Sequence, residues 1–159
     1  MFESFVRVRF HEVDRLGHVN NAAYLNYLEQ AAIDHAGALG LGFERLQGFG
    51  GYFVAHRHEI DFLRPAFAGD LLRVLTWLGV ARGARVERSY LIVREPSPAR
   101  LVPAFGDLVA HPEKPPEAAL VARARTEWVF ATPEGKARRI PRELSALLED
   151  NAGSTDAAR

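Results

Sequence analysis

Asp14-Arg15-Leu16-Gly17-His18-Val19-Asn20-Asn21-Ala22-Ala23-Tyr24 runs directly into residues 25–39, a segment rich in apolar side chains. Asparagine is favourable at the start of a helix, where its side-chain oxygen can accept a hydrogen bond from the backbone. The first N–H groups of any helix have no partner within the helix itself. The stretch therefore predicts a carboxylate close to free backbone N–H groups. Such a site could serve for attack on a carbonyl group.

The segment that follows the stretch is expected to form a helix from Ala22 to Leu39. Its apolar residues cover most of the helix circumference, which predicts that the helix is buried on nearly all sides. Gly40 and Gly42 favour the end of the helix at this point.

Strands are expected on both sides of this helix. Phe5 to Phe10 alternates apolar and basic residues, the pattern of a half-buried strand. Four longer segments after the helix are rich in Val, Leu, Phe and Trp, at residues 52–63, 70–80, 85–94 and 120–131. A short helix that ends near Leu148 follows. This order predicts an α+β fold in which a curved five-stranded antiparallel sheet wraps one long buried helix.

Length and composition fit a single domain over residues 1–150. A chain of 159 residues with 48% hydrophobic content can bury a core without disulfides or a structural metal. Six of the nine prolines fall within residues 95–119, which we expect to form a loop insert. Residues 151–159 are expected to be a polar tail. One helix cannot cover the edges of a five-stranded sheet, so we expect strand edges to pair between subunits of a homo-oligomer.

Charge and residue usage argue against several classes of protein. The 20 basic and 20 acidic residues cancel, so no overall basic field would attract nucleic acid or an anionic membrane. No apolar run approaches the roughly 18 residues of a membrane span. The absence of cysteine removes disulfides and thiol nucleophiles, and it fits a cytoplasmic location.

Histidine spacing gives no metal site. His11 and His18 lack the separation of a zinc-binding helix, and His56 and His58 are expected on one face of a strand as an exposed pair. We therefore expect no metal ligands and no cofactor.

A wider set of motifs resembles a known family. These motifs are Asp14-x-x-Gly17-His18-Val19-Asn20-Asn21-x-x-Tyr24-x-x-Tyr27-x-Glu29, Phe62-x-Arg64-Pro65 with Gly69-Asp70, and Arg139-Ile140-Pro141. In this order they resemble the hotdog-fold acyl-CoA thioesterases of the 4-hydroxybenzoyl-CoA thioesterase-like superfamily. The resemblance covers about residues 4–148 without the insert, and it implies one hotdog thioesterase domain that hydrolyses an acyl-CoA to a free acid and coenzyme A. It also implies a homodimer, or a homotetramer built as a dimer of dimers, with active sites at the subunit interface.

The resemblance assigns roles to the residues of the opening stretch. Asp14 would be the reactive carboxylate, either as a nucleophile or as the base that activates a water. Asn21 would hold the thioester oxygen through its main-chain N–H, supported by the positive end of the helix dipole. His18 would orient Asp14 or contact the substrate, or it would bond only within its own loop. Asn20 is better explained as a helix cap than as a catalytic donor.

Further residues are candidates for substrate binding. Tyr24 would fill the core or line the acyl pocket. Glu29, a polar residue on the same predicted helix, is a second candidate for substrate binding. In the family, the phosphates of coenzyme A are contacted from the turn between the third and fourth strands and from near the C-terminus. The matching residues are Arg82, Arg85, Arg138 and Arg139, for each of which a solvated surface charge is the alternative.

The sequence is also compatible with other functions. A non-catalytic acyl-CoA-binding module would keep the pocket without needing Asp14, and fold alone does not imply catalysis. A dehydratase on the same fold is disfavoured, because the Asp and His arrangement associated with it is absent. The acyl group is not defined by the sequence, and an acyl carrier protein could replace coenzyme A as the donor.

Overall fold

The computed structural model describes residues 1–96 and 119–150. The predicted insert therefore lies outside the described residues, apart from its ends at 95, 96 and 119, and so does the predicted tail at 151–159. The elements follow the chain as β1 (Phe2–Arg7), the 3-10 turn η1 (Phe10–Glu12), α1 (Asn21–Ala38), α2 (Phe43–Gly48), β2 (Tyr52–Phe62), β3 (Leu71–Leu78), β4 (Arg85–Arg94), β5 (Ala119–Ala131) and α3 (Arg142–Glu149).

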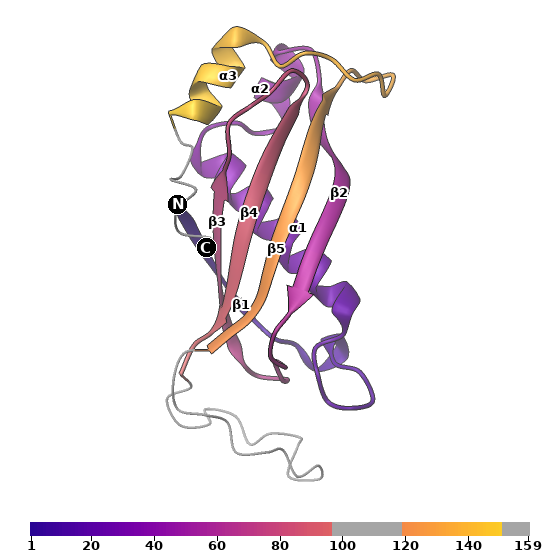
Figure 1. Cartoon of the computed structure of the whole chain (residues 1–159), viewed down its shortest axis with the longest axis vertical. Coiled ribbons are helices and arrows are strands. Elements are labelled where there is room, and N and C mark those ends of the chain that lie inside the picture. Colours follow the sequence, from indigo (N-terminus) through magenta and orange to yellow (C-terminus); the bar gives the residue numbers. More distant parts are fainter. Residues whose placement is uncertain (97–118, 151–159) are drawn as a thin grey trace.

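The described strands form one five-stranded sheet in the order β1-β3-β4-β5-β2. Every neighbouring pair in this sheet is antiparallel. The sheet is curved and open, and α1 lies across one of its faces (Figure 1). The predicted α+β fold, with a five-stranded antiparallel sheet on one long helix, is confirmed.

Two apolar clusters fill the space between α1 and the sheet. The first surrounds the N-terminal half of α1 and includes Tyr24, Tyr27 and Leu28. The second lies under α2 and α3 and includes Phe130 and Leu144, both fully buried. The site of interest at the start of α1 therefore rests on the first cluster.

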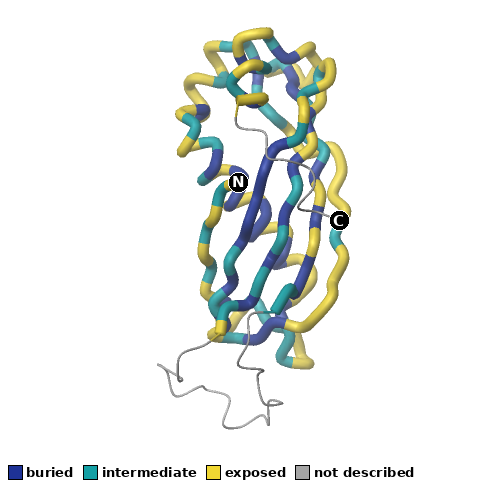
Figure 2. The backbone as a smooth tube through the Cα atoms, turned by 60° about the vertical axis from the view of Figure 1, so that its left-hand side comes forward, coloured by how far each residue is buried: buried dark blue, intermediate teal, exposed yellow. Residues whose placement is uncertain are grey.

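The prediction that α1 is buried on nearly all sides is wrong for the single chain. The helix buries one stripe, while Leu25 on its other side is 39% exposed and Ile33 is 58% exposed. One sheet can cover only one side of a helix, so these apolar residues stay exposed. Figure 2 shows exposed and buried residues alternating along the backbone.

The first strand also begins earlier than predicted. It covers Phe2–Arg7 instead of Phe5 to Phe10, in register with β3 from Thr76 to Leu71. The backbone of Val8 still exchanges hydrogen bonds with the turn before β3, but the chain then enters η1. This turn is stabilised by the Arg9 N–H, which donates to the carboxylate of Glu12 at 2.6 Å.

Strand β2 is an edge of the sheet and is exposed along most of its 11 residues. Among the described residues it pairs on one side, with β5. An edge of this length with free backbone groups is a surface on which another strand can pair.

Candidate functional site

Residues 13–19 form a tight loop between η1 and α1. The Asp14 N–H donates to the His18 carbonyl at 2.8 Å, and the Gly17 N–H donates to the Asp14 carbonyl at 3.0 Å. Gly17 has a φ of 77°, a conformation that glycine adopts without strain. Val13 and Val19 pair across the base of the loop. The loop geometry is thus defined by backbone hydrogen bonds, with Asp14 near its start.

The carboxylate of Asp14 has one oxygen engaged and one available. Its Oδ1 accepts from the Leu16 N–H at 2.8 Å and from the His18 N–H at 3.2 Å. Oδ2 makes no hydrogen bond to any residue that the structure describes, and the side chain is exposed. Asp14 therefore stabilises its own loop and still presents a free anionic oxygen.

The start of α1 supplies a free backbone donor. Asn20 is the N-cap, as the sequence indicated: its side-chain oxygen accepts from the Ala22 N–H at 2.9 Å. Its carbonyl accepts from the Ala23 N–H at 2.9 Å. Asn21 lies between these groups, and its N–H has no hydrogen-bond partner within residues 1–96 and 119–150. An oxyanion bound here would accept a hydrogen bond from that N–H, and the positive end of the helix dipole would stabilise its charge.

The turn before β3 holds the loop against the sheet. The Val19 N–H donates to the Ala66 carbonyl at 2.8 Å, and His18 pairs with Phe67 through the backbone. The His18 ring also packs edge-on against Phe67, with ring centroids 5.4 Å apart. His18 therefore contacts Asp14 through its main chain, and its ring anchors the loop.

Aromatic residues on α1 pack behind this loop. Tyr24 is 3% exposed and its ring contacts those of Tyr27 and Phe62. Burial raises the pKa of Tyr24 to about 12, with a smaller contribution from Asp70. Tyr24 thus belongs to the core at the start of α1, whereas Glu29 is exposed on the helix.

The Tyr27 hydroxyl donates to the Glu12 carboxylate at 2.9 Å. Burial raises the pKa of Tyr27 well above its ordinary value, and this bond adds to the shift. The main chain of Glu12 also accepts from the Asn20 N–H at 2.8 Å, which ties η1 to the helix cap.

The four candidate arginines lie at the opposite end of the sheet from Asp14. Arg82 and Arg85 flank the turn that leads into β4, and the Ile140 N–H donates to the Gly83 carbonyl of this turn at 2.9 Å. The segment of Arg138 and Arg139 therefore lies at the same end, near α2 and α3 (Figure 1). The Asp14 loop meets the turn before β3, beyond the other end of β4. Ten residues of strand separate the two ends, which is about 30 Å.

These arginines differ in their contacts. Arg85 forms an ion pair with Glu127, which also lies 3.8 Å from His56. The Arg138 guanidinium donates to the Gly50 carbonyl at 3.2 Å. Arg82 and Arg139 are exposed. A single chain thus does not bring any of them to Asp14.

The expectation that His56 and His58 share a face is wrong. The pairing of β2 with β5 shifts register between Ala55 and Arg57, so His56 is the extra residue of a bulge. His56 lies near Glu127, while His58 bonds to Thr126 at 2.9 Å. Thr126 and Glu127 are neighbours on β5 and face opposite sides of the sheet.

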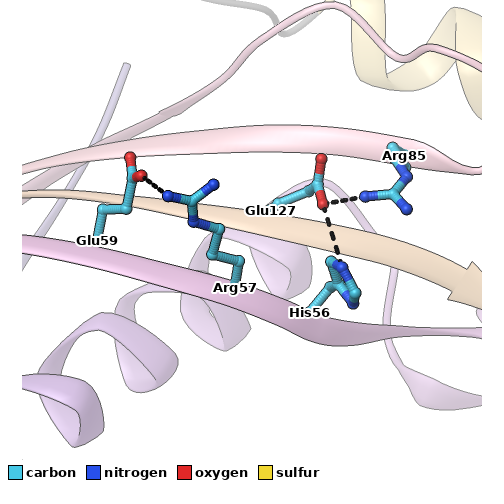
Figure 3. Close-up of polar contacts among 5 residues, drawn as sticks. All are labelled: His56, Arg57, Glu59, Arg85 and Glu127. Carbon is cyan, nitrogen blue, oxygen red and sulfur yellow. Dashed lines mark hydrogen bonds and ion pairs between the residues drawn. The ribbon is translucent and has the colours of Figure 1, made fainter.

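Figure 3 shows His56 beside Glu127, next to the ion pair of Arg57 and Glu59 at 2.5 Å. Among the described residues, no group of three or more His, Asp or Glu side chains could hold a metal ion.

Comparison with known proteins identifies the family. Residues 8–148 match the model of the thioesterase-like superfamily. The chain belongs to this superfamily. Among its relatives, the long-chain acyl-CoA thioesterase FadM of Escherichia coli is 34% identical over 95 residues, which cover 57% of this chain and 68% of FadM. The chloroplastic acyl-acyl carrier protein thioesterase ATL3 of Arabidopsis thaliana is 26% identical over 101 residues, 64% of this chain and 53% of that protein. The chain thus spans about half the length of ATL3.

Solved structures of thioesterase-like proteins share the fold. The probable thioesterase YbaW of Escherichia coli superimposes with a TM-score of 0.72 and 26% identity, over 96% of this chain and 100% of that one. A 4-hydroxybenzoyl-CoA thioesterase complexed with 4-hydroxybenzoyl-CoA gives a TM-score of 0.74 at 19% identity, over 92% and 97% of the two chains. The resemblance to hotdog-fold thioesterases is confirmed. Within the described residues of this superfamily member, no helix has both the length and the apolar composition of a membrane span.

One polar group of this thioesterase-like chain was missed by sequence reasoning. Arg88 is 5% exposed on β4, and its Nη1 lies 2.8 Å from Nδ1 of His35 and donates to the Thr76 hydroxyl at 3.2 Å. Burial and the neighbouring guanidinium lower the pKa of His35 to about 4, with a smaller contribution from the N-terminal ammonium. The alternation of side chains along β4 could have revealed the burial of Arg88, because it places Arg88 on the same face as the buried residues Val86 and Tyr90.

Proposed function

We propose that this chain hydrolyses acyl-CoA thioesters, with Asp14 as the reactive carboxylate and the main-chain N–H of Asn21 as the oxyanion donor. The observation that carries the proposal is that two groups without hydrogen-bond partners lie where the Asp14 loop meets the start of α1. These are Oδ2 of Asp14, in the loop of residues 13–19, and the N–H of Asn21, at the start of α1, neither of which has a hydrogen-bond partner among the described residues. Membership of the superfamily and the activities named for its relatives support the same reaction.

The proposed chemistry needs no further group from the protein. The Asn21 N–H would bind the thioester oxygen and stabilise the negative charge that develops there. Asp14 would attack the carbonyl carbon, so that the C–S bond breaks, coenzyme A leaves as a thiolate, and a mixed anhydride remains for water to hydrolyse. In the alternative route Asp14 removes a proton from a water, which then attacks the same carbon.

The proposal includes a second copy of the chain. The Asp14 loop and the candidate arginines lie about 30 Å apart in one subunit. Strand β2 runs between these two ends and has a free edge. If two copies pair their β2 strands antiparallel about a two-fold axis, the arginine end of one lies beside the Asp14 loop of the other. Arg82, Arg138 and Arg139 would then contact the phosphates of coenzyme A, while Arg85 is already paired with Glu127.

Thiol release from a panel of acyl-CoAs tests the reaction. We expect turnover by the wild type and a loss of at least about 100-fold in kcat for Asp14→Asn, with binding of acyl-CoA retained. Asn keeps an oxygen acceptor for the loop, so this variant removes charge with little change in shape. Asp34→Asn, on α1 and hydrogen-bonded through its side chain to Gln30 among the described residues, is the control for the same change of charge. Binding without thiol release by the wild type would instead identify a non-catalytic acyl-CoA-binding module.

Single-turnover hydrolysis in oxygen-18 water separates the two routes. Label that enters Asp14 supports the anhydride route, and label found only in the product acid supports direct attack by water. The panel should include acyl carrier protein thioesters as well, because ATL3 is named for that donor.

Mixed dimers test the shared site. One subunit carries Asp14→Asn and the other carries Arg82, Arg138 and Arg139 changed to Gln. Each heterodimer contains one intact site and one site that lacks both contributions. Random mixing should therefore restore about a quarter of wild-type activity from two inactive parents. No recovery in verified heterodimers would contradict a site shared between subunits.

A further inference from the structure

A cavity of about 150 Å³ lies at the end of α1 remote from the Asp14 loop. The C-terminal half of α1, the inner face of the sheet, α2 and α3 form its walls. Its lining is almost entirely apolar and includes Ala32, Ala36, Leu46 and Leu78. Ile33, one of the lining residues, is 58% exposed, so the cavity reaches the surface of the single chain. Ala32 follows Asn21 by eleven residues on α1, about 16 Å along the helix, so within one chain the cavity is separate from the Asp14 loop.

Among the described residues that line this cavity, the charged side chain is Arg88. It is 95% buried, and arginine stays protonated at any physiological pH. Its two described hydrogen bonds both use Nη1 and go to the neutral groups His35 and Thr76. Within residues 1–96 and 119–150, no carboxylate pairs with this guanidinium, and neither Nε nor Nη2 has a partner.

A buried cation without a counter-ion is costly, because the protein interior does not replace the water that it loses. Three of the five N–H donors of Arg88 remain unused. A planar carboxylate matches such a donor set with two parallel hydrogen bonds. The cavity therefore combines apolar walls with the side of the Arg88 guanidinium that carries Nε and Nη2, which we call its free edge.

We propose that this cavity binds a small apolar molecule that carries one carboxylate, with the carboxylate on the free edge of the Arg88 guanidinium. A cavity of about this volume in another protein holds benzene, so one aromatic ring or a short branched chain fills it. A phosphate is excluded as the natural ligand, because its second negative charge would be unpaired among apolar side chains. Acids of this class are also products of thioester hydrolysis, but binding here depends on Arg88 and not on Asp14.

Two-dimensional NMR with sodium benzoate as the probe tests the proposal on the whole chain. The protein has two tryptophans: Trp128 lines the cavity, whereas Trp77 does not. Benzoate should shift the indole N–H signal of Trp128 in a saturable manner and leave that of Trp77 unchanged. Benzamide, which has nearly the same shape and no charge, should bind at least tenfold more weakly.

Two variants test the two parts of the site. Arg88→Met removes the charge and Ala36→Phe fills the cavity, and each should weaken benzoate binding at least tenfold. Asp14→Asn should bind benzoate as the wild type does, whether or not the chain hydrolyses thioesters. Equal affinity for benzamide and benzoate in the wild type would overturn the proposal even if Arg88→Met failed to fold. Unchanged binding by a folded Arg88→Met or Ala36→Phe variant would overturn it as well.

Discussion

Protonation of His35 should destabilise the fold in mild acid. His35 is 5% exposed, its ring stacks on Phe2, and its Nδ1 faces the guanidinium of Arg88 at 2.8 Å. Because the guanidinium can only donate, Nδ1 must accept and the ring must be neutral. A proton on Nδ1 would break this bond and place two positive charges together in the interior.

The size of the effect follows from the pKa. Burial and Arg88 lower the pKa of His35 from 6.5 to about 4 in the folded chain. Between these values the unfolded chain binds a proton that the folded chain does not, so the free energy of unfolding falls as the pH decreases. About 2.5 pH units at about 1.4 kcal/mol each give an upper value of about 3.5 kcal/mol. Since part of the shift comes from the N-terminal ammonium, whose field water screens, we expect about 2 kcal/mol.

Urea unfolding at a fixed protein concentration between pH 7 and pH 4 measures this loss. His35→Gln keeps an acceptor for Arg88 and cannot titrate, so it serves as the control for every other group that titrates in this range. The wild type should lose about 2 kcal/mol more than His35→Gln across the window. Parallel pH profiles, or a histidine pKa near 6.5 by NMR for this ring, would refute the assigned cause.

Three further substitutions should lower the free energy of unfolding, each measured by urea unfolding at pH 7. Asn20→Ala removes the helix cap and should cost about 1 kcal/mol, and a loss below about 0.3 kcal/mol would contradict its capping role. Tyr27→Phe leaves the Glu12 carboxylate without its hydroxyl donor and should cost about 1 to 2 kcal/mol, whereas a gain in stability would refute that bond. Gly51→Ala would place Cβ 2.3 Å from the Ala131 carbonyl oxygen, so backbone must move and we expect a loss above about 2 kcal/mol, with wild-type stability as the contrary result.

The sequence predicted the later strands of the sheet well, because residues next to each strand mark where it begins and ends. The strand expected at Arg85–Arg94 is found with the same ends. The strand expected from Tyr52 to Leu63 ends one residue earlier, at Phe62. Turn residues such as Gly83, with a φ of 63°, mark these boundaries in the sequence itself. The same is true of Asn20, whose capping role depends only on its neighbours.

Features set by distant residues could not be predicted in the same way. Arg88 and His35 are 53 positions apart, and no local pattern links them. The bulge at His56 depends on pairing with β5, so the alternation of β2 alone assigned this side chain to the wrong face. The outward apolar residues of α1 have no partner within the described part of one chain, so helical periodicity predicted burial that a single subunit does not provide.

The exposed side of α1 and the free edge of β2 have a common explanation in the proposed dimer. Leu25 on α1 and Phe62 on β2 are both exposed, at 39% and 46%. A second copy paired along β2 would continue the sheet and bring its own α1 toward these residues. The same contact would bring the arginine end of one subunit to the Asp14 loop of the other. Dimer formation would then both bury the exposed side of α1 and complete the proposed active site. A variant that weakens the dimer should therefore lose stability and turnover together.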